Sequence, residues 1–178
     1  SMLDGQVSLL TYLATAALNT GSPPPRLGNR HLSIAPYKTY QAADGWLNLA
    51  VANEKLWVKC CEVMGHPEWA TDPRFNSNHL RVENQHALEA TLGPVLAKQT
   101  VEQWVDIFTQ AGIPAGPVLG IDEVLAHPQL AARGMVTALE HPDAGTVKVT
   151  GVPVRLEGTP GSAKTPPPAL GEHSDEIL

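Results

Sequence analysis

The residues best suited to bind a ligand lie together in a short polar loop, Asn29-Arg30-His31. The guanidinium of Arg30 can pair with a phosphate or a carboxylate through two parallel hydrogen bonds. The imidazole of His31 can donate a hydrogen bond to the oxygen of an acid or a thioester. These side chains can equally satisfy the backbone of their own loop, so the residues alone leave both interpretations open.

The segment that follows the loop predicts the framework that positions it. An extended run, 37–42, leads to Asp44-Gly45, which is a strong hairpin signal. The returning run, 46–51, is apolar and rich in β-forming residues, as expected of a covered strand. Asn53 then stands where a helix N-cap belongs. We therefore predict a β-hairpin that runs directly into a helix.

Helical signals occupy most of the remaining N-terminal two thirds. Apolar spacing predicts helices over 1–19 and 54–64, the first apolar on so many sides that it needs cover from another surface or a second copy. Asn84 is predicted to cap a helix that Gly93-Pro94 kinks or splits. The sequence from Thr100 to Gln103 is a capping box that begins a further helix ending near Gly112. Short helices are predicted at 121–126 and 127–134, with a loop at 113–120 between them and the preceding helix.

Strand signals return towards the C-terminus, at 135–140, 146–150 and 152–156. The stiff connector Gly21–Pro25 and the Pro/Gly-rich stretch 158–169 separate these elements from the chain ends. We predict an α+β fold, a small antiparallel sheet with several helices, and divide the chain into a helix and linker (1–25), a small α+β domain (26–157) and a tail (158–178).

Composition excludes several classes of protein. A net charge of −6, without a cluster of Lys and Arg, argues against a non-specific nucleic-acid binder. No run of apolar residues predicts a membrane span, and no basic segment precedes the apolar N-terminus as in a signal peptide. Cys60 and Cys61 are neighbours, which predicts buried thiols rather than a disulfide and fits a reducing compartment.

Familiar catalytic and metal-binding motifs are absent from the sequence, including Gly-x-Gly-x-x-Gly, Gly-x-Ser-x-Gly and His-Glu-x-x-His. His79 and His86 lie seven residues apart and can share a helix face. No carboxylate stands near enough in the sequence to complete a metal site, so we predict two surface histidines.

Four groups of residues together resemble the class III CoA-transferase (CaiB/BaiF) family, in the order in which that family carries them. The first is the set Asn29, His31, Pro36-Tyr37, Asp44-Gly45 and Asn53. Segments 112–118, 127–135 and 171–174 resemble the family's "GvPagPV", "hPqlaaRgm" and "GEHt" motifs. Ser1–Gly5 resembles the family's "vdvSLlda", so the chain is similar to the C-terminal half of these enzymes.

The resemblance implies a function in which CoA passes from an acyl-CoA to a small carboxylic acid. In the family an aspartate attacks the acyl-CoA and later carries CoA as a thioester; that aspartate lies upstream of the segment seen here, and Asp4 stands in the wrong place to replace it. The fragment alone is therefore expected to be inactive. An α-methylacyl-CoA racemase and a non-catalytic lid or dimerisation module are the alternatives.

The resemblance also implies the partners and the site. It predicts a cytoplasmic homodimer with interlocked subunits, no permanently bound cofactor, and flanking segments that belong to a Rossmann-like α/β domain for CoA. The expected substrate-binding residues are Asn29, Arg30, His31, Ala35 and Tyr37. Residues 112–118 are expected to shape the acyl pocket. Some members shield the reacting group with a glycine-rich loop, where this chain has Ser33-Ile34-Ala35.

Overall fold

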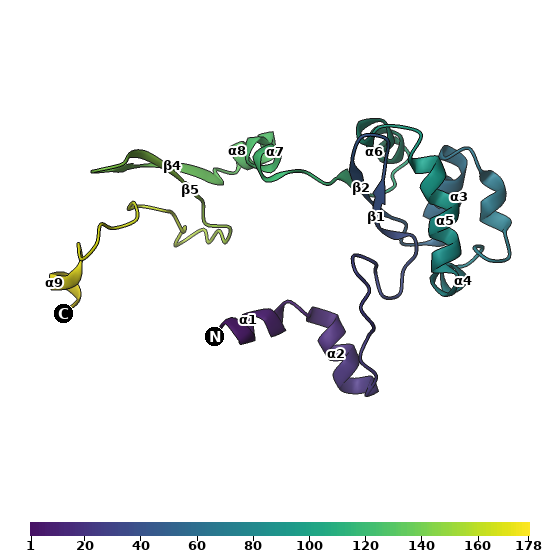
Figure 1. Ribbon diagram of the computed structural model, residues 1–178, viewed down its shortest axis with the longest axis horizontal. Coiled ribbons are helices and arrows are strands. Elements are labelled where there is room, and N and C mark those ends of the chain that lie inside the picture. Colours follow the sequence, from purple (N-terminus) through teal and green to yellow (C-terminus); the bar gives the residue numbers. More distant parts are fainter. The chain divides into compact units, whose positions relative to one another are not determined.

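A computed structural model describes all residues, 1–178, and divides the chain into two compact units, Ser1–Val118 and Leu119–Leu178. The elements can be followed along the chain in Figure 1. Helices predominate and all strand pairs are antiparallel, which confirms the predicted α+β class. The predicted limits 1–25, 26–157 and 158–178 differ from the observed division and stay a prediction.

The first unit is built on a three-stranded antiparallel sheet of order β1-β2-β3, formed by β1 (Tyr37–Gln41), β2 (Trp46–Ala50) and β3 (Ala115–Pro117). The predicted hairpin is confirmed: Gln41 pairs with Trp46, and the Ala42 amide donates to the Gly45 carbonyl at 2.8 Å. β3 was expected to be loop. It forms an edge strand, where Pro117 is tolerated because its missing N–H faces away from the ladder.

Four α-helices and one 3₁₀-helix follow the hairpin in this unit. They are α3 (Glu54–Val63), η1 (Pro67–Thr71), α4 (Asn78–Glu83), α5 (Gln85–Leu96) and α6 (Val101–Gln110). Two predicted caps are confirmed. Asn53 accepts the Leu56 amide at 3.0 Å, and Thr100 and Gln103 exchange both bonds of the capping box. Asp44 also accepts the Val101 amide at 2.8 Å, so the hairpin turn helps to fix the start of α6.

The core of this unit lies between the helices and one face of the sheet. Its fully covered side chains come from the hairpin, α3, α5, α6 and the connecting segments beside them. The largest apolar ones are Trp57, Trp104, Phe75, Phe108, Leu47, Leu49, Leu88, Leu92, Leu96, Ile113 and Val51. Burying this much apolar surface supplies the main driving force for folding of the unit.

Two predictions about α5 (Gln85–Leu96) were right only in part. Asn84 is the N-cap residue of α5, as predicted, but its side chain accepts no amide. Its Nδ2 instead donates to the carbonyls of Leu80 and Arg74, because α4 ends immediately before it. Gly93-Pro94 does not split the helix, which continues to Leu96. Pro94 lacks the N–H for one helical hydrogen bond, and the buried side chains of Leu88, Leu92 and Leu96 stabilise the helix despite this loss.

The single helix predicted over 1–19 was also wrong. The segment forms α1 (Met2–Ser8) and α2 (Thr11–Thr20), separated at Thr11, whose φ of 45° is incompatible with a continuous right-handed helix. No residue of either helix is buried. Since most helical stability in proteins comes from packing of an apolar face, an uncovered segment has little to keep it continuous.

The second unit contains α7 (Ile121–Ala126), α8 (Pro128–Ala132), a two-stranded sheet of β4 (Val136–His141) and β5 (Gly145–Thr150), and α9 (Ser174–Ile177). The two short helices and both strands were predicted. The third strand, at 152–156, was wrong: Pro153 lacks a ladder N–H, and Val152 and Val154 remain exposed without a pairing strand. No helix of the protein has both the length and the apolar character needed to cross a bilayer.

Candidate functional site

His31 is held in one defined orientation. Its backbone amide donates to the Tyr37 carbonyl at 3.0 Å, and its ring stacks with the rings of Tyr12 and Tyr37, with centroids 5.7 and 5.0 Å away. The ring nitrogen Nδ1 accepts the Ser33 amide at 3.1 Å. An accepting Nδ1 places the proton of a neutral imidazole on Nε2. His31 therefore presents an Nε2–H donor, and no group of the chain accepts from it.

Arg30 is committed to an ion pair within the chain. Its Nε and Nη2 donate to the two carboxylate oxygens of Glu89 at 2.6 and 2.7 Å. Lys38 approaches the same carboxylate at 3.1 Å. The pair joins the polar loop to α5 across 59 positions of sequence, so Arg30 fixes the loop beside His31.

The charge of Glu89 is maintained by these two cations. Partial burial by itself raises the pKa of the Glu89 carboxyl, but the hydrogen bonds from Arg30 and Lys38 outweigh it, and the pKa lies below its ordinary value of 4.5. The bond to Glu89 in turn raises the pKa of Arg30. At neutral pH the loop is thus held to α5 by the ionised side chains of Arg30, Lys38 and Glu89.

Ala35 and Asn29 occupy contrasting positions. The Ala35 side chain is fully buried; its amide donates to Asn78 Oδ1 at 3.1 Å and its carbonyl accepts from Arg81 Nε at 2.7 Å. The side chain of Asn29 is exposed and makes no hydrogen bond within the chain. Of these two residues, only Asn29 offers polar atoms to a ligand.

Tyr37 lines a pocket on the uncovered face of the three-stranded sheet. The pocket has a volume of about 440 Å³ and is lined by Tyr37, Asn48, Ala50, Pro114, Ala115 and Gly116. It therefore brings together two segments singled out in the sequence, the start of β1 and the segment 112–118. Its position follows from the alternation of the strands: Leu47 and Leu49 of β2 face the core, and Asn48 between them faces outward.

Asn48 is a candidate site residue that the sequence did not indicate. Thr39, directly opposite it in the hairpin, donates to its Oδ1 at 2.6 Å. This bond leaves the Asn48 amide NH₂ without a partner in the chain and available to the pocket. On the other side, Asn48 pairs with Gly116, where an added Cβ would meet no atom within 4 Å and would enter the pocket. The alternating pattern of β2 was the only signal for this residue.

The chemistry of this face is that of hydrogen-bond donors beside an apolar wall. Asn48, the Tyr37 hydroxyl and, next to Tyr37, His31 offer donors, whereas Ala50, Pro114 and Ala115 supply apolar surface. Such an arrangement suits a ligand whose oxygens accept hydrogen bonds and whose chain is short and apolar. None of these residues is an activated nucleophile, so the face can orient a ligand without attacking it.

The two cysteines cannot supply a nucleophile. Both are fully buried and free, and the Cys60 sulfur lies 3.7 Å from the Met64 sulfur. Burial raises the pKa of Cys60, and burial raises the pKa of Cys61 to about 12. Both thiols therefore stay protonated at neutral pH, as expected of structural cysteines.

The histidines predicted to lie at the surface do so. His79 and His86 are both exposed. The structure contains no group of three His, Cys, Asp or Glu side chains placed to hold a metal ion.

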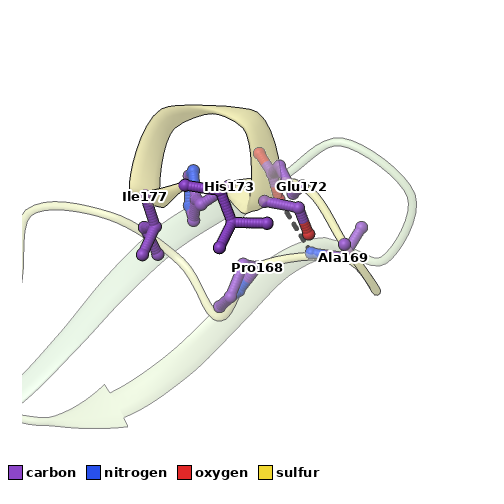
Figure 2. Close-up of a pocket in the computed structure, with 8 residues that line it drawn as sticks. Pro168, Ala169, Glu172, His173 and Ile177 are labelled. Atoms are coloured by element: carbon purple, nitrogen blue, oxygen red, sulfur yellow. Dashed lines mark hydrogen bonds between the residues drawn. The ribbon is translucent and has the colours of Figure 1, made fainter.

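A second pocket lies within the C-terminal tail, where the "GEHt"-like segment is found. Figure 2 shows Pro168, Ala169, Glu172, His173 and Ile177 around it, with the Glu172 carboxylate accepting the Ala169 amide at 2.7 Å. His173 Nδ1 lies 3.5 Å from a Glu176 oxygen. One short stretch thus folds onto itself, and its polar side chains are used locally. The face of the sheet at Tyr37 remains the better candidate.

The chain was also compared with known proteins. The family model for CoA-transferase family III matches residues 1–174. An acetyl-CoA:oxalate CoA-transferase from Acetobacter aceti is 40% identical over 158 residues, which are 89% of this chain and 39% of that protein. An acyl-CoA transferase from Fusarium pseudograminearum is 38% identical over 180 residues, covering 100% of this chain and 40% of the relative.

A solved structure shares the fold. The crystal structure of a CaiB/BaiF family protein from Brucella suis superimposes with a TM-score of 0.79 at 32% identity, over 96% of this chain and 44% of that one. The chain thus spans about two fifths of the length of the curated relatives it matches.

The ion pair of Glu89 makes stability depend on pH. Because the folded pKa lies below the ordinary value, Glu89 stabilises the fold above about pH 4.5, and this contribution disappears as pH falls through the folded pKa. We expect Glu89→Gln to lower the free energy of unfolding at pH 7 by about 1–2 kcal/mol, and the difference from wild type to shrink below pH 4.5.

Urea unfolding of both proteins between pH 3 and pH 7 measures this difference. Glu54 also has a lowered pKa, so the difference between the two curves, rather than the wild-type curve, isolates Glu89. Glu83→Gln on α4 is the matched control, since Glu83 is exposed and unpaired. A Glu89→Gln curve parallel to wild type at all pH values would show that the pair carries no charge-dependent stability.

Proposed function

The chain belongs to CoA-transferase family III, and we propose that it forms the C-terminal part of an enzyme that moves CoA from an acyl-CoA to a carboxylic acid. The named relatives are both transferases, which favours transfer over the racemase alternative. Their greater length supports the view that further residues, including the nucleophile, come from outside the segment seen here.

The observation that carries this proposal is the donor-lined pocket beside His31. A thioester carbonyl and a carboxylate both present oxygens that accept hydrogen bonds. Asn48 and Tyr37 offer donors from the pocket lining, and the His31 ring, stacked on Tyr37, offers Nε2–H beside it. We place the acyl group against Ala50, Pro114 and Ala115. The CoA thioester enters as a substrate, and no permanent cofactor is part of the proposal.

The covalent steps fall to an aspartate outside this chain. Its carboxylate attacks the thioester carbonyl and expels CoA thiolate, which then attacks the aspartyl carbonyl of the resulting anhydride and releases the first acid. The incoming acid then attacks the aspartyl-CoA thioester, which forms a second anhydride and expels CoA thiolate. The thiolate attacks the acyl carbonyl of this anhydride, which forms the new acyl-CoA and frees the aspartate. Each attack develops negative charge on a carbonyl oxygen, which is the species that a donor such as His31 Nε2–H stabilises.

The other predicted site residues receive more limited roles. Because Arg30 forms an ion pair with Glu89, we assign it the role of holding the loop instead of binding the acceptor acid. Ala35 contributes its backbone to the frame of the loop. Asn29, which is exposed and unpaired, and Tyr37, which lines the pocket, stay candidates for direct substrate contact.

We also propose that the chain functions in a homodimer in the cytoplasm. Free buried thiols support a reducing compartment. The exposed apolar side chains of the segment 1–20, among them Leu3 of α1, Leu9 between the helices and Leu18 of α2, support association through this segment. The 178-residue chain is expected to increase in mass with concentration in light scattering, and Leu3→Glu together with Leu18→Glu to reduce that increase. A constant monomer mass would contradict association through these helices.

His31→Ala in the intact enzyme tests the proposed site. Removing one donor to a developing oxyanion costs about 10²–10³ in rate, so we expect kcat to fall by about this factor with little change in KM. The melting temperature should change little, because the ring makes only stacking contacts and one bond within its own loop.

Steady-state transfer from acetyl-CoA to oxalate and to succinate, followed by chromatography of the CoA esters, measures these constants. His86→Ala is the matched control, since that histidine is exposed. Wild-type kcat and KM in His31→Ala would remove this histidine from the site, and a loss of activity matched by a loss of melting temperature would reveal a structural role alone.

A further inference from the structure

Asn78, in the first turn of α4, makes two hydrogen bonds to the loop that carries His31, which here includes residues 29–35. Its Nδ2 donates to the Ser33 carbonyl at 2.8 Å, and its Oδ1 accepts the Ala35 amide at 3.1 Å. One carboxamide thus engages two backbone groups two residues apart, as a neighbouring strand would. The bonds cross more than 40 positions of sequence and connect a helix to the loop.

The position of Asn78 is fixed by hydrogen bonds that involve Glu54 and Arg81. Its backbone amide donates to Glu54 Oε1 at 2.8 Å, and the other oxygen of Glu54 accepts from Arg81 Nη1 at 2.8 Å. Arg81 is completely buried and also donates to the Ala35 carbonyl. Glu54 and Arg81 therefore fix the position from which Asn78 reaches the loop.

The Asn78 side chain is not needed to begin its own helix. Ser77 is the N-cap of α4, and its Oγ accepts the Leu80 amide. Asparagine also has only modest helix propensity at a helical position. Both polar groups of the Asn78 carboxamide bond to the loop, so the side chain stabilises the loop and not its own helix.

The connection from Asn78 to His31 is short. Asn78 fixes Ser33 by its carbonyl, and the Ser33 amide donates to His31 Nδ1 at 3.1 Å. That last bond decides which ring nitrogen carries the proton. An unrestrained Ser33 would leave the imidazole free to exchange between its two neutral forms.

We propose that Asn78 is a positioning residue of this site: through Ser33 it keeps His31 in the neutral form that donates from Nε2. The catalytic consequence rests on the proposed function of His31, whereas the effect on the ring itself does not. Asn78 acts on the ligand only through the loop, and the sequence around it gave no indication of this.

Asn78→Asp is the sharpest variant. It preserves the size and the Oδ1 acceptor for Ala35, but it replaces the donor to Ser33 with an oxygen that repels the Ser33 carbonyl. A new carboxylate near a helix N-terminus is favourable, so α4 should remain folded. Asn78→Ala removes the carboxamide without adding charge and is the second variant.

Asn84→Asp is the matched control. Asn84 lies at the opposite end of α4, and its Nδ2 also donates to backbone carbonyls, those of Leu80 and Arg74. The same chemical change there removes the same kind of bond without touching the loop.

The first readout is the ¹⁵N spectrum of the imidazole rings in the 178-residue chain at alkaline pH, where imidazoles are neutral. His31→Ala assigns the signal. We expect wild type and Asn84→Asp to show His31 protonated at Nε2 alone, and Asn78→Asp and Asn78→Ala to show a mixture of both neutral forms. An unchanged Nε2–H signal in both Asn78 variants would overturn the proposal.

The second readout is turnover in the intact enzyme with acetyl-CoA and oxalate. We expect Asn78→Asp to lower kcat by about 10- to 100-fold with KM nearly unchanged, and Asn84→Asp to leave both unchanged. A mixed His31 signal with wild-type kcat would support the positioning of the ring and overturn the proposed role of His31 in transfer. A fall in kcat with an unchanged His31 signal would overturn the positioning itself.

Discussion

The buried guanidinium of Arg81 is the interaction on which the first unit depends. A charge with no access to water costs several kcal/mol unless hydrogen bonds replace its solvation. Arg81 Nε donates to the Ala35 carbonyl, and Nη1 donates to the Phe75 carbonyl and to Glu54. The buried Nη2 has no hydrogen-bond partner, and the guanidinium carbon lies over the Trp57 ring, 4.9 Å from the centroid. Because these partners come from different segments, the bonds of this one cation bring together the segment at Ala35, the turn before α4 and the start of α3.

The position of the candidate ligand-binding face follows from this arrangement. One side of the sheet is covered by the helices, and the strand period of two then leaves the alternate residues Tyr37, Thr39 and Asn48 on the open side. The polar loop returns to the edge of that side because it is held at both ends, by Glu89 through Arg30 and by α4 through Ala35. The site therefore combines a rigid sheet with a loop whose conformation is imposed from the core.

Local signals predicted the frame but not the contacts that complete it. The hairpin, the Asn53 cap and the Thr100 capping box depend on neighbouring residues, so they could be found in the sequence. Arg81, Asn78 and Glu89 act on partners more than 40 positions away, and nothing in their own surroundings distinguishes them from solvent-exposed helical residues. The prediction of one continuous helix over 1–19 was wrong for a related reason, since periodicity cannot show whether an apolar face is covered.

We propose that the open face of the sheet at Tyr37 receives the acyl group. Photolabelling of the intact enzyme with an acyl-CoA that carries a diazirine in its acyl chain tests it most directly. We expect peptide mapping to place the label on Tyr37 or residues 114–116, and we expect Gly116→Val, whose side chain would enter the pocket, to abolish the label. Label confined to another surface, such as the outer face of α3 at Lys55 and Lys59, or label that Gly116→Val leaves unchanged, would contradict it.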